Sequence, residues 1–173
     1  MDAKLDRFVA LDVEIASRRP LAVCAVGATR VEFGCETAAF SSLVRFDGRV
    51  SFSRIHGLHR ADLKRAPPWP VVWKRILAVL DDIRIVVAFK ADFDRGALLV
   101  MSARHGIRMP RMEFVCAAEM LEHHCGLRLG LEESLMALAL PFPGRPHEPL
   151  ADARAAALVV RHSARSQLLR PKR

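Results

Sequence analysis

The sequence contains no tyrosine and only four cysteines in 173 residues. Stacking of a nucleic-acid base on tyrosine is therefore excluded. The cysteines have no paired spacing that indicates a disulfide framework, so we expect a reduced, cytoplasmic setting. No apolar run approaches the roughly 20 residues that span a bilayer, and the polar N-terminus lacks the apolar core of a signal peptide. These absences predict a cytoplasmic protein that has no membrane as a partner.

Acidic residues are scarce relative to basic ones, with 19 Asp and Glu against 27 Lys and Arg and a net charge of +8. An excess of this size in a small domain favours polyanionic partners, nucleic acid above all. A composition rich in Arg and Ala also arises from genomic base bias, so charge alone does not decide the partner. Hydrophobic residues make up 51% of the chain, which suits one globular domain with a buried core.

The last acidic residue is Asp152, and the cations that follow it are Arg154, Arg161, Arg165, Arg170, Lys172 and Arg173. We expect one domain over residues 1–165, followed by a basic tail over residues 166–173. This tail is either a phosphate-binding segment or a frayed basic terminus.

The stretch from Phe8 to Glu14 is apolar for its first four residues and then carries two acids two positions apart. Such a short run, rich in Val, Leu and Phe, predicts a buried strand. Side chains alternate faces along a strand, so Asp12 and Glu14 point the same way. Two such carboxylates repel each other unless a cation lies between them. The alternative is that the strand has entered solvent by Asp12.

The remaining pattern predicts an α/β protein with a mixed central sheet of about five strands flanked by helices. We expect the first strand to break after Glu14 and an irregular segment to lead from Asp47 to Pro70. A continuous apolar run predicts a buried parallel strand over 83–89. The other predicted strands cover 22–32, 36–46 and 113–115. Helices are predicted over 72–80, from Asp94 to Gly106, and over 117–124, 131–139 and 149–168.

Four acids and one histidine stand at positions that suit a common site, namely Asp12, Glu14, Asp94, Asp152 and His147. Asp94 follows the carboxyl end of a predicted strand, where open α/β sheets gather their sites. Carboxylates from distant segments suit hard cations such as Mg²⁺ or Mn²⁺. Two such ions stabilise the attacking and leaving oxygens in phosphodiester hydrolysis. A histidine on a loop can take the proton from the attacking water.

These residues resemble the motifs of the DnaQ-like, or DEDDh, 3′–5′ exonucleases. Phe8 to Glu14 resembles the first motif of that family, and Phe93-Asp94 looks like the end of the second. The stretch from His147 to Arg154 is similar to the third, which is His, four residues, Asp and an Ala-rich helix. Residues 55–73 are similar to the His-Gly and Ala-Pro elements that precede a Trp-containing helix. The resemblance covers about residues 6–162, and its motifs occur in the family's order.

The resemblance implies a ribonuclease-H-like fold and removal of nucleotides from a 3′ end. It implies that Asp12, Glu14, Asp94 and Asp152 hold two Mg²⁺ or Mn²⁺ ions and that His147 is the general base. His56, in the His-Gly element, would lie near the terminal nucleotide. The similarity extends to stand-alone members and to the proofreading subunit of a bacterial replicative DNA polymerase. A DNA polymerase partner and roles in replication and repair are therefore expectations as well.

The sequence departs from the family's pattern at two of the motifs. Ile15-Ala16-Ser17 follows the first-motif glutamate, where the family commonly has a threonine. This change removes a hydroxyl beside the terminal nucleotide, so Ile15 and Ala16 are the expected substrate contacts there. In the second motif Phe89-Lys90 replaces a common His-Asn. Lys90 is either a phosphate contact or an ordinary solvated strand end.

Two classes of function follow from these motifs. The first is a metal-dependent 3′–5′ exonuclease acting on single-stranded DNA, with RNA or short oligoribonucleotides as the alternative substrate. The second is a nucleic-acid-binding or polymerase-docking module whose chemistry has weakened through the altered motifs. Retention of all five residues that the family uses for catalysis favours the enzyme.

Overall fold

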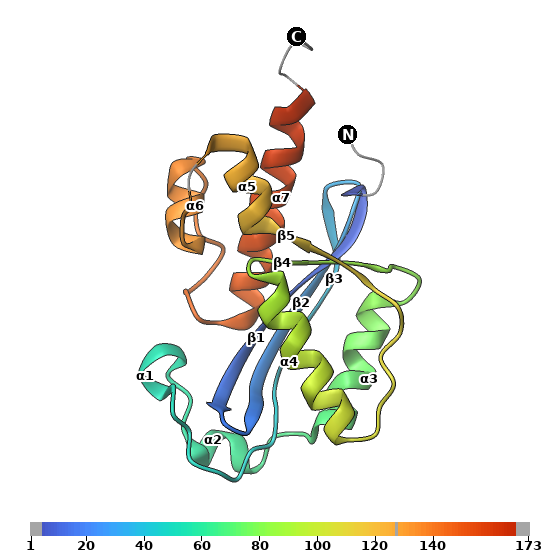
Figure 1. Ribbon diagram of the computed structural model, residues 1–173, viewed down its shortest axis with the longest axis vertical. Helices are drawn as coiled ribbons and strands as arrows, with labels where there is room; N and C mark the ends of the chain where they lie inside the picture. The colour runs from blue at the N-terminus through green and yellow to red at the C-terminus, as the bar shows by residue number, and fades with distance from the viewer. Residues whose placement is uncertain (1–4, 127, 169–173) are drawn as a thin grey trace.

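The fold is built on one mixed sheet with strand order β3–β2–β1–β4–β5. A computed structural model describes the backbone of residues 5–126 and 128–168, and side chains as far as Ala164. The first three strands form an antiparallel meander, and the last two run parallel to the first (Figure 1). The strands are β1 (Arg7–Arg18), β2 (Leu21–Glu32), β3 (Cys35–Leu43), β4 (Ile85–Ala88) and β5 (Glu113–Cys116). The predicted mixed sheet of five strands is confirmed.

The first strand is longer than the sequence pattern predicts, because β1 continues through Arg18 and the expected break after Glu14 is wrong. Ile15 and Ala16 remain buried, with 6% and 0% of their surface exposed. Pairing with β2 shifts register between Glu14 and Ser17 and then continues to the hairpin end at Arg18. The two acids therefore mark one face of a continuing strand and not its end.

The segment expected to be irregular contains two short helices, α1 (Ser53–His56) and α2 (Arg60–Lys64). Neither is long enough to show a helical period in the sequence, which is why the pattern missed them. α2 begins with a local cap, in which the His59 backbone N–H donates to Asp62 Oδ2 at 2.8 Å. The prediction of a structureless segment is wrong at these two places.

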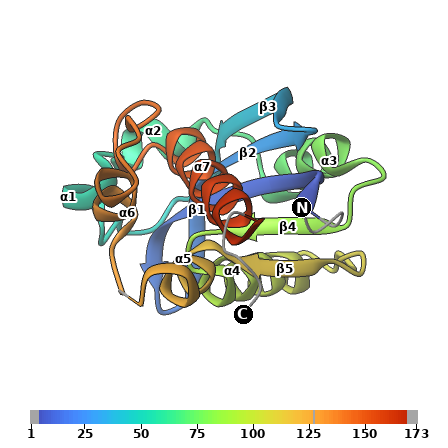
Figure 2. The same ribbon diagram turned by 90° about the horizontal axis from the view of Figure 1, so that it is seen from above.

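Helices cover both faces of the sheet (Figures 1 and 2). α3 and α4 pack on one face, and α5, α6 and α7 on the other. Trp69 and Trp73 are buried and stack on each other with ring centroids 5.7 Å apart, so they pack within the core. The helices are α3 (Trp69–Leu80), α4 (Ala91–Arg104), α5 (Ala117–Cys125), α6 (Leu131–Ala137) and α7 (Pro149–Leu168).

Alternate residues of β1 serve the two helical layers. Val9, Leu11 and Val13 pack against α3 and α4, whereas Phe8 and Ala10 pack with α5 and α7. Because the period of a strand is two, Asp12 and Glu14 continue the set that faces α7. The alternation places both carboxylates beside the first turn of that helix.

The basic tail predicted over residues 166–173 lies beyond the last described side chain. The helix α7 continues to Leu168, whereas Arg170, Lys172 and Arg173 lie outside the described residues. Within the part of the chain that the structure describes, no helix is long and apolar enough to cross a membrane.

Candidate active site

The site begins on β1, where Asp12 pairs with Gly27 of β2 and Glu14 pairs with Ala25. The pairing register shifts immediately after Glu14. Irregularities of this kind bend a strand and redirect its side chains, and they are common beside active sites. Local strand geometry therefore sets the direction in which Glu14 points.

Gly27 allows the start of α7 to approach the sheet closely. A Cβ atom at this position would collide with the backbone of Pro149 and Leu150. Any other residue would therefore push the first turn of α7 away from β1 or distort the strand. Gly27 is a positioning residue that nothing in the sequence pattern singled out, because a glycine in a strand does not reveal which helix crosses it.

Asp94 comes to the same place from the first turn of α4. Its side chain is 3% exposed, and its Oδ1 accepts a hydrogen bond from the Val13 backbone N–H at 3.1 Å. Val13 lies between the two acids of β1, so this bond holds Asp94 against that strand. The parallel pairing of β1 with β4 ends at Ala10. Beyond that residue, the Asp94 carboxylate accepts the hydrogen bond from the Val13 N–H of β1.

Asp152 and His147 are fixed to each other at the N-terminus of α7. The His147 backbone N–H donates to both carboxylate oxygens of Asp152, at 3.3 and 3.2 Å. His147 has a φ of 63°, in the left-handed region that a residue with a side chain rarely adopts. Such strain persists where the surroundings impose it, and it gathers at functional sites.

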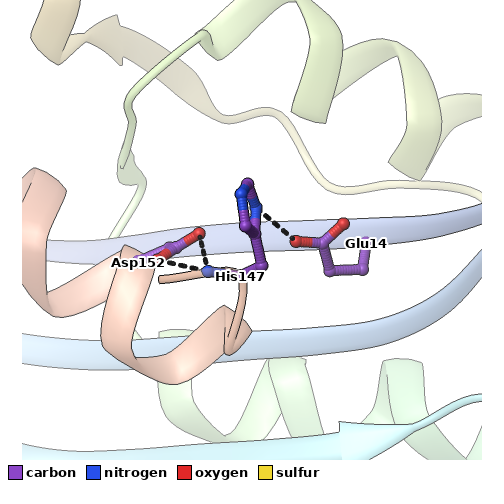
Figure 3. Close-up of side chains that lie close together, drawn as sticks. All are labelled: Glu14, His147 and Asp152. Atoms are coloured by element: carbon purple, nitrogen blue, oxygen red, sulfur yellow. Dashed lines mark hydrogen bonds and ion pairs between the residues drawn. The ribbon is translucent and has the colours of Figure 1, made fainter. Parts of the chain in front are cut away.

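Figure 3 shows that the His147 ring lies beside the carboxylates of Glu14 and Asp152. Its Nδ1 is 3.6 Å from Glu14 Oε1, and half of the His147 side chain is exposed. Glu14, His147 and Asp152 each place a ligand atom within 4.8 Å of the other two. Three oxygen or nitrogen ligands at this separation can share one metal ion.

The carboxylates are held in a state that favours either a proton or a cation. Burial raises the pKa of Glu14 to about 7; the nearby His147 opposes this shift, and repulsion by Asp152 adds to it. Burial raises the pKa of Asp94 to about 7 and that of Asp152 to about 6, although hydrogen bonds from backbone N–H groups oppose both shifts. Burial and its three acidic neighbours raise the pKa of Asp12 well above its ordinary value.

Asp12 supplies the most direct sign that a cation fits this site. Its Oδ2 is buried and has no hydrogen-bond partner among the described residues. An unpartnered buried carboxylate oxygen is costly, and a buried charge is normally paired or bound to metal. Oxygen donors from Asp12, Glu14, Asp94 and Asp152 match the preference of Mg²⁺ and Mn²⁺. The residues present therefore fit a divalent metal site.

These residues line a cavity of about 250 Å³. Asp12, Glu14, Asp94, His147 and Asp152 all contribute to its wall, so the structure brings together the five residues predicted as catalytic. Phe93 of the second motif also lines the cavity, and the wall is completed by residues to which the sequence pattern gave no role, among them Gly130, Leu131, Glu132, Phe142 and Pro146. Several of these precede or begin α6, and no spacing in the sequence connects that segment with the acidic motifs.

The four residues predicted to contact substrate occupy different environments. Lys90 is exposed and lines the cavity. Ile15 and Ala16 have buried side chains, which leaves their backbone as the part beside Glu14. His56 is half-buried, and its Nδ1 accepts the Leu58 backbone N–H at 3.0 Å. Burial lowers the pKa of His56, and the nearby His147 adds to that effect.

Comparison with known proteins identifies the family. A family profile described as Exonuclease (RNase_T) matches residues 9–160, which is most of the chain. The chain belongs to this exonuclease family. The match includes the acids of β1, Asp94, and the first turn of α7, and it confirms the predicted DnaQ-like, DEDDh membership. The protein is thus a nuclease that hydrolyses phosphodiester bonds. No curated protein matches the sequence significantly.

Solved structures similar to this exonuclease confirm the ribonuclease-H-like fold. The nuclease domain of 3′hExo, a DEDDh family member bound to rAMP, is 14% identical with a TM-score of 0.81, over 96% of this chain and 95% of that one. Exonuclease X in complex with 5′ overhanging duplex DNA is 20% identical with a TM-score of 0.68, over 92% and 93%. S. pombe Pop2p in its Mg²⁺- and Mn²⁺-bound form is 13% identical with a TM-score of 0.73, over 94% and 84%.

Proposed function

We propose that this exonuclease removes nucleotides one at a time from the 3′ end of single-stranded DNA. Asp12, Glu14, Asp94 and Asp152 hold two Mg²⁺ or Mn²⁺ ions, and His147 is the general base. The observation that carries the proposal is the convergence of four carboxylates and one imidazole on a single cavity. We assign this activity to a domain over residues 1–165, and residues 166–173 form a basic tail outside it.

The four carboxylates are suited to holding metal because burial disfavours their negative charge in the absence of a cation. Glu14 and Asp152 already lie within 4.8 Å of each other through their ligand atoms, and Asp12 Oδ2 has no other described partner. Bound divalent ions would activate the attacking water and stabilise charge on the scissile phosphate. The similarity to Pop2p, whose structure contains Mg²⁺ and Mn²⁺, supports this assignment.

His147 accepts the proton of the attacking water in this proposal. The half-exposed ring lies at the mouth of the acidic cavity, and its backbone is fixed by Asp152. Fixing the backbone while leaving the ring accessible orients an imidazole that exchanges protons with solvent. Positioned general bases of this kind contribute about 10²–10⁴-fold to rate.

Residues around the cavity bind the terminal nucleotide. Lys90 contacts a phosphate from the end of β4, where its ammonium is exposed beside the cavity. His56 contacts the terminal nucleotide with its half-buried ring. Ile15 and Ala16 contribute backbone groups, because both side chains lie in apolar clusters.

The proposal is tested with a 5′-end-labelled single-stranded DNA, incubated with Mg²⁺, with Mn²⁺ or with EDTA. A ladder of products shortened from the 3′ end, present with metal and absent with EDTA, is the expected result. A matched substrate blocked by a 3′-phosphate controls for the direction of digestion. Cleavage within the strand, or digestion from the 5′ end, would contradict the proposal.

RNA is the second candidate substrate. The similar nuclease domain of 3′hExo was solved bound to rAMP, and metal ligands with a histidine base do not read the 2′-hydroxyl. Single-stranded DNA and RNA of the same sequence separate the two, compared by kcat/KM at one salt concentration. Faster digestion of the RNA would make the protein an exoribonuclease or oligoribonuclease without changing the assignment of the site.

A further inference from the structure

At one end of the molecule the β1–β2 hairpin lies beside α1 and α2 (Figure 1), and these elements and their ends carry six cations. We call this surface the basic rim. All of its cations are exposed, and they are Arg18, Arg19, Arg54, Arg60, Lys64 and Arg65. Between residues 50 and 65 the single acid is Asp62, and its Oδ2 accepts the His59 backbone N–H at the start of α2.

The cations of the basic rim differ from several other arginines in having no acidic partner. Arg7 and Arg30 both lie within 3.0 Å of Glu32, and Arg154 lies 2.7 Å from Glu36. Among the described side chains, none of the six rim cations forms an ion pair with a carboxylate within 4.0 Å. Their charge is therefore available to an anionic partner, and exposed charges of one sign attract such a partner over about a Debye length, ~10 Å.

The basic rim is joined to the acidic cavity by the extension of β1 beyond Glu14. Arg18 is four positions beyond Glu14, which corresponds to roughly 13 Å along an extended strand. The segment that carries α1 is fixed to this extension, because the Ser51 N–H donates to the Ala16 carbonyl at 2.7 Å. The Arg18 guanidinium also lies 5.5 Å from the centre of the Phe52 ring.

A second contact fixes α1 beside the cavity itself. Cys24 Sγ lies 3.4 Å from the Glu14 carbonyl oxygen and 3.9 Å from His56 Nε2. His56 is the last residue of α1, so Cys24 of β2 links the end of this helix to the backbone of Glu14. The basic rim therefore has a defined position relative to the cavity.

We infer that the basic rim binds the phosphate backbone of nucleic acid outside the acidic cavity. The inference rests on the proposed function and extends it to the length of the substrate. A separation of roughly 13 Å equals about four nucleotides at 3.4 Å per residue of a stacked strand. A dinucleotide fills the cavity without reaching the rim, whereas a strand of twelve nucleotides reaches both.

The test uses the double variant Arg54→Gln/Arg60→Gln, which removes one rim charge from α1 and one from α2. The control is Lys74→Gln/Arg75→Gln, which removes two exposed charges from α3. Binding of a labelled 12-nucleotide single strand is measured by fluorescence anisotropy across a salt series, in Ca²⁺ to prevent cleavage. Turnover of a dinucleotide is measured separately in Mn²⁺.

Each phosphate contact on a single strand adds about 0.7 to the slope of log affinity against log salt. The rim variant is therefore expected to lower the slope by about 1.4, weaken binding of the 12-mer about tenfold at low salt, and leave dinucleotide turnover unchanged. Arg54→Lys/Arg60→Lys should restore the slope because it restores the charge. The α3 control should retain the wild-type slope.

Equal slopes in the rim variant and the α3 control would overturn the inference. An equal loss on the dinucleotide and the 12-mer would do the same, because it would place the effect inside the cavity. The two proposals fail separately. A wild-type protein that releases nothing from any 3′ end, yet binds the 12-mer through the rim, loses the proposed function and keeps this inference. If the protein digests 3′ ends normally but the rim variant leaves the salt dependence of binding unchanged, the proposed function stands and this inference fails.

Discussion

Asp94→Asn tests the electrostatic account of the site most directly, because the substitution changes charge with little change in shape. The Asp94 side chain is 3% exposed, and its Oδ1 accepts the Val13 backbone N–H. Asparagine keeps an oxygen for that bond and removes the negative charge. Without metal, we expect the variant to be more stable than the wild type, although it loses activity.

The magnitude follows from the pKa of Asp94, which burial and the nearby Glu14 raise from 3.8 to about 7. Each pKa unit corresponds to about 1.36 kcal/mol between the folded and unfolded states. The full pKa shift corresponds to a loss of up to about 4 kcal/mol in the free energy of unfolding. Because the neighbouring carboxylates share this electrostatic penalty, we expect Asp94→Asn to recover about 2 kcal/mol. For a chain of this length, that corresponds to a melting temperature about 4–8 °C higher.

Because folding raises the pKa of Asp94, the stability gained by Asp94→Asn depends on pH in a defined direction. A carboxyl whose pKa is higher when folded destabilises the protein increasingly as the pH rises from about 4, its unfolded value, to about 7. Above pH 7 the penalty is complete. Asp94→Asn should therefore show its full advantage at pH 8 and progressively less as the pH falls toward 4.

Thermal unfolding in EDTA at pH 8 and at pH 5 measures this advantage, and Asp94→Ala is the matched control. The alanine variant also removes the charge, but it leaves the buried Val13 N–H without its acceptor, at a cost of about 1–3 kcal/mol. We expect the asparagine variant to melt above the alanine variant. Excess Mg²⁺ or Mn²⁺ should stabilise the wild type by about 2.7 kcal/mol at 100 times its Kd, and either variant less.

Two results would refute this reasoning. The first is an Asp94→Asn variant in EDTA at pH 8 that is no more stable than the wild type. The second is an equal metal-induced rise in melting temperature for the wild type and the variant. The first outcome would show that Asp94 carries no net charge penalty in the fold, and the second would remove it from the metal ligands.

Three further predictions test other parts of the site. His147→Ala should lower turnover about 10²–10⁴-fold while binding of single-stranded DNA in Ca²⁺ stays near normal, and full turnover at neutral pH would place the base elsewhere. Gly27→Ala should cost about 1–3 kcal/mol in thermal unfolding through overpacking, and much of the activity. The control is Gly96→Ala, where a Cβ meets no atom within 4 Å; it should keep both the stability and the activity of the wild type. Mn²⁺ affinity, measured by titration calorimetry, should fall from pH 8 to pH 6 because Glu14 and Asp94 have pKa values of about 7 and must lose protons to bind metal. An affinity independent of pH would contradict that account.

The sheet could be predicted from sequence because its strands carry a strong period or a continuous apolar run. The alternation around Asp12 and Glu14 predicts a shared face, and the structure places both residues beside α7. Segments without a period escaped prediction. α1 and α2 span four and five residues, too few to repeat an apolar position, so their helical state depends on packing against β1 and on a local cap.

The candidate site was predictable to the extent that short motifs carry it. His147 and Asp152 are five residues apart, and a single helix start brings them together. The approach of α7 to the sheet could not be predicted, because it depends on Gly27 of β2 having no side chain where Pro149 and Leu150 pass over it. The segment around Glu132 also joins the cavity wall only through the tertiary arrangement, and no local spacing records that.

The distribution of paired and unpaired charges explains why the net charge of +8 indicated a class of partner but not a location. Arg7 and Arg30 form ion pairs with Glu32 and Asp82 near the start of β1. The same strand then carries Asp12 and Glu14 at its centre. It ends at Arg18, which, like Arg19 in the turn that follows, has no ion-pair partner among the described side chains. Unpaired charge is costly to a fold where it is buried, and at a surface it raises the affinity for a partner of opposite sign. Under the proposals made above, the order along β1, from ion pairs to acids to exposed cations, would orient a polyanion with its end at the carboxylates and its backbone at the arginines.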